Sequence, residues 1–132
     1  MAVFADTSGL LASSDRNDGH HARARQFWEE RIAGREVFIA TNYVLTETFA
    51  LIQSRLGIAA VREFQADMVP LLGVQWVDEP LHQAGIAAVL AAGRRQLSLV
   101  DCVSFEVMRR LRLAQAFAFD RHFEDQGFTC LP

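Results

Sequence analysis

Residues 2–6 read AVFAD, an apolar run of strand length that ends in a carboxylate, Asp6. Four later runs have a similar length and apolar character and are enriched in strand-forming residues. They cover residues 36–40 (EVFIA), 73–77 (GVQWV), 116–119 (AFAF) and 128–131 (FTCL). The sequence therefore predicts four to five short strands, beginning at the N-terminus.

Longer stretches with apolar residues at helical spacing separate these runs. We expect helices over residues 18–32, 42–56, 59–72, 79–95 and 99–111, a short turn after Asp120, and loops around 13–19 and 93–97. Thr41 or Asn42 caps the second helix, Gly57 ends it, and Ser98 opens the last. Alternating strands and helices are typical of a parallel sheet covered on both faces, with right-handed crossovers. We predict an α/β fold, a three-layer α/β/α arrangement in a single domain over residues 1–132.

Composition narrows the class of protein. Hydrophobic residues make up 51% of the chain, which excludes a disordered tail, and no apolar run approaches the roughly 18–20 residues that span a bilayer. Without a secretion signal, and with Cys102 and Cys130 in no paired motif, we expect a soluble cytoplasmic protein with reduced thiols. The net charge of −3 argues against a simple electrostatic clamp on nucleic acid, although all 13 basic residues are arginine.

Acidic residues recur where an apolar run ends or a helix begins. Asp6 and Asp120 directly follow predicted strands, and Asp101 lies three residues after Ser98, in the first turn of a helix. Glu47 lies in the first two turns of a helix that is apolar nearly all round, with no basic residue three or four positions away. Because sites in open parallel sheets form at the carboxyl ends of the strands, these carboxylates are expected to share one crevice.

Several carboxylates in one crevice repel each other unless a cation lies between them. A ligand set of oxygens, without Cys or His, favours Mg²⁺ or Mn²⁺ over zinc. Such sites bind phosphate and activate water for phosphodiester hydrolysis. Taken singly, each acid has another explanation: Asp6 as a cap, Asp101 as a helix-dipole partner and Asp120 as a turn residue. A purely structural explanation is weakest for Glu47, because its helix is apolar nearly all round.

Four motifs resemble those of PIN domains, in the expected order and from end to end. They are residues 4–12 (FADTSGLLA), Thr46-Glu47, residues 98–105 (SLVDCVSF), and residues 118–123 (AFDRHF) followed by Gly127-Phe128. The resemblance implies a parallel sheet between helices and an acidic pocket that binds Mg²⁺ or Mn²⁺. It also implies endoribonuclease activity, in which water cuts RNA to leave 5′-phosphate and 3′-hydroxyl ends.

The same resemblance assigns roles to residues and partners. Asp6, Glu47, Asp101 and Asp120 would hold the metal, supported by Thr7 and Ser104. Prokaryotic PIN domains of this length are commonly VapC-type toxins, homodimers that a partner antitoxin inhibits. Candidate RNA contacts are Arg16, Arg23, Arg25 and Arg121. The small residues of 84–93 (AGIAAVLAAG) allow close helix packing, either inside the protein or across a dimer.

Three other functions remain open at this point. An RNA-processing PIN nuclease without an antitoxin would share every motif. A receiver-like signalling domain would share the fold class and an acidic metal pocket, but it needs a lysine, and the chain has none. A binding module that keeps the fold without catalysis would have no need of the complete set of acids.

Overall fold

The computed structural model describes residues 2–132 and contains a five-stranded parallel sheet in the order β3-β2-β1-β4-β5. The strands are β1 (Ala2–Ala5), β2 (Val37–Thr41), β3 (Leu72–Gln75), β4 (Gln115–Phe117) and β5 (Thr129–Leu131). All five predicted strands are present, each within two residues of its predicted start. The first strand lies at the centre of the sheet, so its carboxyl end has neighbours on both sides.

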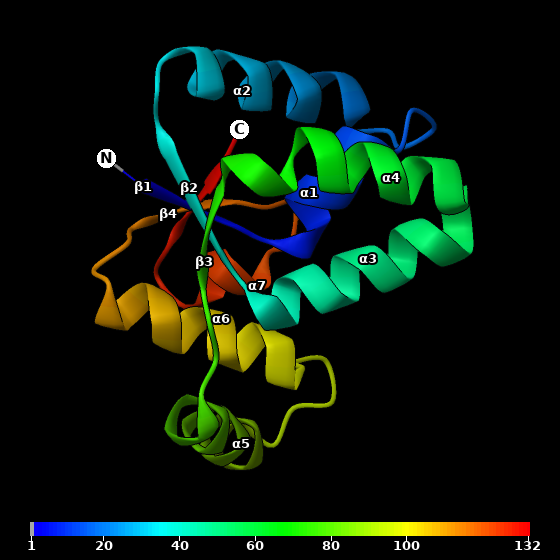
Figure 1. Ribbon diagram of the computed structural model, residues 1–132. Helices are drawn as coiled ribbons and strands as arrows, with labels where there is room; N and C mark the ends of the chain where they lie inside the picture. The colour runs from blue at the N-terminus through cyan, green and yellow to red at the C-terminus, as the bar shows by residue number, and fades with distance from the viewer. Residues whose placement is uncertain (1) are drawn as a thin grey trace.

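Helices cover both faces of the sheet, as Figure 1 shows, with α1, α2 and α4 on one face and α5, α6 and α7 on the other. Their bounds are α1 (Thr7–Ser14), α2 (His21–Ala33), α3 (Asn42–Leu56), α4 (Ile58–Asp67), α5 (Glu79–Ala92), α6 (Leu99–Arg110) and α7 (His122–Asp125). Helix α3 runs beside α1 and α4. The predicted three-layer α/β/α fold is therefore confirmed.

Helix boundaries follow the capping signals in the sequence. The Thr41 hydroxyl accepts a hydrogen bond from the backbone N–H of Val44 at 3.1 Å, and Gly57, with a φ of 91°, ends α3. The helix predicted over residues 59–72 was too long. Helix α4 ends at Asp67, and a 3₁₀ turn over Val69–Leu71 replaces its last residues. Pro70 lies in that turn, and proline cannot donate the backbone hydrogen bond that a continuing helix needs.

Helix α1 was not predicted, and part of it was taken as a loop. It begins directly after Asp6 and packs against α2, α3 and the end of β4. Six of its eight residues are buried, so polar and apolar residues do not alternate at helical spacing. A short helix enclosed on nearly every side leaves no amphipathic pattern in the sequence.

Aromatic side chains fill the core on both faces of the sheet. Phe38 contacts Trp28 of α2 with ring centroids 4.6 Å apart, whereas Phe4 contacts Phe123 of α7 at 6.3 Å. Because side chains alternate along a strand, Phe4 and Asp6 point to the same face when the backbone stays extended. Asp6 has φ −88° and ψ 158°, which is extended, so its carboxylate faces the layer of α6 and α7.

The small residues of α5 pack internally in part. A methyl group on Gly85 would lie 2.5 Å from a methyl carbon of Val103 on α6, so this glycine allows the close contact between the two helices. Leu90, on the same helix, is 76% exposed. None of the helices within residues 2–132 has the length and apolarity needed to cross a membrane.

Gly9 on α1 offers a test of how tightly that helix packs on β4. A Cβ atom at Gly9 would lie 2.5 Å from the carbonyl oxygen of Phe117 and 2.8 Å from its ring. We expect Gly9→Ala to lower the free energy of unfolding by about 2 kcal/mol, because overpacking outweighs the helix preference of alanine. Urea denaturation measures this, with Gly19→Ala as control, since nothing lies within 4 Å of a Cβ there. Equal stability of both variants would contradict the packing.

Candidate active site

Asp6 lies at the carboxyl end of the central strand and also begins α1. Its side chain is the N-cap of that helix: Oδ2 accepts hydrogen bonds from the backbone N–H of Ser8 at 3.1 Å and from the Ser8 hydroxyl at 2.6 Å. The residue is only 5% exposed, and it forms no ion pair with any residue from 2 to 132. A buried carboxylate therefore stands at the edge of the sheet with hydrogen bonds but without a cation.

Ser8 connects this carboxylate to the neighbouring strand. Its hydroxyl donates to Asp6 and accepts a hydrogen bond from the backbone N–H of Phe119, just beyond β4, at 3.0 Å. The backbone N–H of Asp6 donates to the carbonyl of Phe117 at 3.1 Å. Sequence reasoning gave Ser8 no role, although a hydroxyl two residues after a buried Asp was an available signal. Ser8 thus joins Asp6 to the backbone of Phe119, the residue that precedes Asp120, through hydrogen bonds.

Asp101 lies in the first turn of α6, where it forms a capping box with Ser98. The Ser98 hydroxyl accepts from the backbone N–H of Asp101 at 3.1 Å, and Oδ2 of Asp101 accepts from the backbone N–H of Ser98 at 3.2 Å. Asp101 therefore does have the structural role expected of an acid at the start of a helix. It does not exclude a second role, because the box occupies only one carboxylate oxygen.

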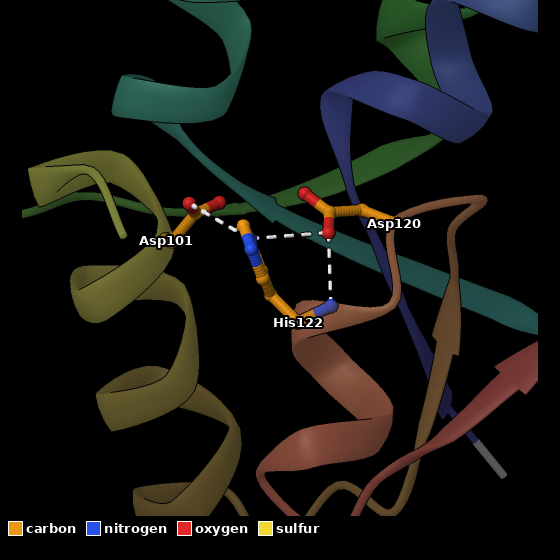
Figure 2. A group of neighbouring side chains, drawn as sticks. All are labelled: Asp101, Asp120 and His122. Atoms are coloured by element: carbon orange, nitrogen blue, oxygen red, sulfur yellow. Dashed lines mark hydrogen bonds and ion pairs between the residues drawn. The ribbon is translucent and has the colours of Figure 1, made fainter. Parts of the chain in front are cut away.

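Asp120 and His122 complete a cluster with Asp101, and Figure 2 shows the three side chains converging from α6, the loop after β4, and α7. Oδ1 of Asp120 accepts from the backbone N–H of His122 at 2.9 Å. Nδ1 of His122 lies 3.2 Å from Oδ1 of Asp120 and 3.7 Å from Oδ2 of Asp101. One potential ligand atom from each residue lies within 4.8 Å of the others. Sequence reasoning did not single out His122, although it stands two residues after Asp120.

The pKa values of two acids reflect this crowding. The pKa of Asp6 is raised from 3.8 to about 6, mainly by burial and also by the charges of Asp101 and Asp120, against the lowering effect of the Ser8 hydrogen bonds. Burial also raises the pKa of Asp101, to which the charge of Asp120 contributes. Asp6, Asp101 and Asp120 thus act on each other electrostatically, as the sequence predicted for carboxylates at one edge of the sheet.

Glu47 and the two supporting hydroxyl residues do not join this cluster directly. Glu47 is half-buried on α3 rather than enclosed, and it makes no hydrogen bond or ion pair in the described part of the chain. The Thr7 hydroxyl donates to the carbonyl of Val44 at 3.3 Å and accepts from Thr48 at 3.1 Å, which ties α1 to α3. The Ser104 hydroxyl donates to the carbonyl of Val100 at 2.8 Å. The Thr7 hydroxyl therefore links two helices, whereas the Ser104 bond stays within α6.

The four candidate RNA-binding arginines occupy different places. Arg16 and Arg25 line a cavity of about 210 Å³ between α1, α2 and α4, and Arg25 also pairs with Glu29 at 2.9 Å. The acids of the cluster do not line that cavity. The Arg23 guanidinium lies 5.9 Å from the ring centre of Phe119, and Arg121 is exposed between Asp120 and His122 in the chain. Arg121 is thus adjacent to Asp120 in the chain, whereas the Arg23 guanidinium donates to the carbonyl of Pro132 at 3.1 Å.

The residues of the cluster fit a divalent cation. The pKa values of Asp6 and Asp101 are raised in part by neighbouring carboxylates, which a positive ion would offset, and Nδ1 of His122 is a buried nitrogen without a hydrogen-bond partner among residues 2–132. The nearest groups could supply oxygen ligands from Asp101 and Asp120, with Asp6 close enough to act on them electrostatically. An ion held here would lie at the carboxyl edge of the sheet, beside the buried carboxylate of Asp6.

Comparison with known protein families places the chain in one of them. The family profile described as the PIN domain matches residues 3–128. This chain is a PIN-domain protein. The resemblance drawn from the four sequence motifs is thereby confirmed, since the match covers nearly every described residue and includes all of the acids discussed above.

Individual relatives agree with this assignment. The PIN domain is 32% identical over 128 residues to the "23S rRNA-specific endonuclease VapC20" of two Mycobacterium tuberculosis strains, covering 96% of this chain and 95% of that protein. The crystal structure of M. tuberculosis VapC20, described as a sarcin-ricin loop cleaving toxin, matches with a TM-score of 0.85 and 31% identity, over 96% of each chain. FitAcB from Neisseria gonorrhoeae has a TM-score of 0.70 at 12% identity, over 100% of this chain and 97% of its own, and shares the fold.

Neutralising Asp6 should stabilise the metal-free protein at neutral pH. A raised pKa means that the contribution of Asp6 to stability is present below pH 3.8 and is lost as the pH rises through about 6. We expect Asp6→Asn, which keeps the helix cap, to raise the free energy of unfolding by about 2–3 kcal/mol at pH 7.5 and to have little effect at pH 3.5.

Urea denaturation in the presence of EDTA measures this difference. Asp67→Asn is the matched control, because Asp67 is exposed at the end of α4 and its charge is in contact with solvent. A variant at Asp6 that is no more stable than the wild type at pH 7.5 would show that the buried charge carries no such cost.

Proposed function

We propose that this PIN domain is a metal-dependent endoribonuclease that hydrolyses RNA phosphodiesters to 5′-phosphate and 3′-hydroxyl ends, as the toxin of a toxin–antitoxin pair. The observation that supports this most is the meeting of Asp6, Asp101 and Asp120, from distant parts of the chain, at one edge of the sheet. It occurs in a chain that aligns with VapC20, an endonuclease by name, over 96% of its length.

The chain's own residues would bind and orient the groups that react. A bound Mg²⁺ or Mn²⁺ would neutralise phosphate charge and lower the pKa of attacking water. Asp6, Asp101 and Asp120 would hold that ion, with Glu47 of α3 as a fourth proposed ligand. Ser8 keeps Asp6 in a fixed orientation, and the Ser98 capping box does the same for Asp101. Thr7 supports these positions by linking α1 to α3, and Ser104, one turn after Asp101 on α6, bonds within that helix.

The substrate is proposed to be RNA, bound largely through the metal site. With a net charge of −3, the chain does not rely on general attraction to phosphates. Arg121 directly follows Asp120 and Arg23 lies beside the ring of Phe119, so these two would contact neighbouring phosphates, whereas Arg16 and Arg25 face a separate cavity. VapC20 is described as specific for 23S rRNA, and we propose a structured RNA for this chain too.

Partners are proposed on the same basis. A VapC-type toxin needs an antitoxin to silence it, so we propose a cognate antitoxin protein and a homodimeric toxin. The exposed side of α5, which includes Leu90 at 76% exposure, offers one surface for assembly. We expect the protein to act in the cytoplasm, where its two cysteines, both free in the structure, stay reduced.

Removal of single carboxylates should abolish cleavage without unfolding the protein. We expect Asp6→Asn and Asp101→Asn to lower RNA cleavage at least about 100-fold, because each removes a charge that would hold the ion, and circular dichroism should be unchanged. The assay is cleavage of total RNA with and without Mn²⁺, followed by mapping of the ends, with Asp67→Asn as control. Full activity in both site variants would remove the proposed mechanism.

A toxin and a processing nuclease differ in what expression does to the cell. Expression of the wild type should arrest growth, and co-expression of a small neighbouring open reading frame should relieve the arrest. Growth arrest that persists in Asp101→Asn would point away from cleavage as its cause. Unaffected growth with RNA cleavage in vitro would favour the processing nuclease.

Binding of the ion should also stabilise the fold, because the site exists only in the native state. We expect millimolar Mn²⁺ to raise the melting temperature of the wild type by several degrees, since about 1 kcal/mol shifts it by roughly 4 °C in a domain of this size, and to leave that of Asp101→Asn nearly unchanged. Calorimetry with Mn²⁺ and with EDTA measures the shift. A wild-type melting temperature that does not change with Mn²⁺ would contradict the proposed metal site.

A further inference from the structure

His122 lies within the last PIN motif and among the acids, but the motif resemblance assigned it no role. Its side chain is 22% exposed, but its Nδ1 atom is buried, and it points between Asp101 and Asp120 (Figure 2). This nitrogen lies 3.2 Å and 3.7 Å from oxygens of the two carboxylates, yet it makes no hydrogen bond within residues 2–132. A buried polar atom left without a partner costs about 1–3 kcal/mol, so a partner is expected.

The orientation of Asp120 does not require the imidazole. The backbone N–H of His122 donates to Oδ1 of Asp120 at 2.9 Å, and that contact exists whatever side chain stands at position 122. Helix α7 is held in the core by Phe123, which is fully buried against Phe4 and Phe105. Other atoms therefore orient Asp120 and anchor α7, and neither task accounts for an imidazole ring at position 122.

We propose that Nδ1 of His122 is a direct ligand of the divalent ion, together with carboxylate oxygens of Asp101 and Asp120. This inference rests on the proposed function, since it concerns the same site. An ion within about 2.0–2.3 Å of each donor would satisfy the orphaned nitrogen and separate two carboxylates that otherwise repel. The three donor atoms lie within 4.8 Å of one another, a spacing that a single ion can bridge.

A nitrogen ligand changes which metal the site prefers. Carboxylate oxygens suit Mg²⁺ and Mn²⁺, whereas imidazole favours metals later in the transition series and binds Mg²⁺ poorly. The acids alone would form a ligand set of oxygens; with His122 included, the site should select Mn²⁺ over Mg²⁺ more strongly than such a set does. The ring nitrogen thus becomes the determinant of metal preference in this PIN domain.

Electron spin-echo spectroscopy of bound Mn²⁺ tests the ligand directly, because a coordinated imidazole nitrogen modulates the echo. We expect the nitrogen modulation in the wild type and its loss in His122→Asn and His122→Leu. His82→Asn is the matched control, since His82 is half-buried on α5 beside Tyr43 and should not affect the signal. All variants keep His20 and His21, so loss of the signal at position 122 alone identifies the ligand.

Metal titrations give a second measurement. Free Mn²⁺ counted by electron paramagnetic resonance, with Mg²⁺ as competitor, yields the ratio of the two affinities. We expect His122→Asn, which offers an oxygen near the position of Nδ1, to lower the preference for Mn²⁺ over Mg²⁺ roughly tenfold. His122→Leu should weaken both ions, and its circular dichroism shows whether the variant folds.

The outcomes separate this inference from the function on which it rests. Mn²⁺ bound without nitrogen modulation, or a His122→Asn variant that weakens both metals by the same factor, overturns the ligand role and leaves the metal nuclease standing. No Mn²⁺ binding by the wild type would falsify both. Nitrogen modulation that disappears only in the His122 variants establishes the ligand.

Discussion

The carboxylate of Asp6 is buried at the carboxyl end of the central strand, where its charge is costly and where the charges of Asp101 and Asp120 make it costlier. Since β1 lies between β2 and β4, Asp6 stands at the middle of the edge formed by the carboxyl ends of the strands. The chain gives Asp6 hydrogen bonds from Ser8 but no ion pair within residues 2–132. Stability is thus given up at the place where a cation and a phosphate would bind.

Helix starts make this arrangement tolerable. Asp6 caps α1, Asp101 lies in the first turn of α6, and Asp120 accepts from the backbone N–H of the first residue of α7. At each position backbone N–H groups without helical partners face the carboxylate, so partial positive charge offsets some of the repulsion. The ordinary structural roles expected for these acids are therefore not rivals of a functional role. They are the means by which three like charges are held together.

The sequence was informative where a local pattern decides the outcome. Short apolar runs between amphipathic stretches predicted the five strands, and the ends of those runs located Asp6 and Asp120. It was uninformative where tertiary contacts decide. Helix α1 is buried on most sides and leaves no periodic pattern, and the bond from Phe119 to Ser8 joins residues 111 positions apart. For Glu47, an apolar helix suggested enclosure, but α3 has one side in solvent, so the residue is only half-buried.

The way each acid is held also bears on how an ion would bind. Oδ2 of Asp6, Oδ2 of Asp101 and Oδ1 of Asp120 accept backbone hydrogen bonds, whereas the second oxygen of each has no hydrogen-bond donor in the part of the chain described. One oxygen of each carboxylate is thus fixed by the fold, and the other is left for a ligand. An ion would then meet side chains that are already oriented, with little side-chain entropy left to lose. Its affinity would come mainly from the relief of repulsion among charges that the fold has placed together in advance.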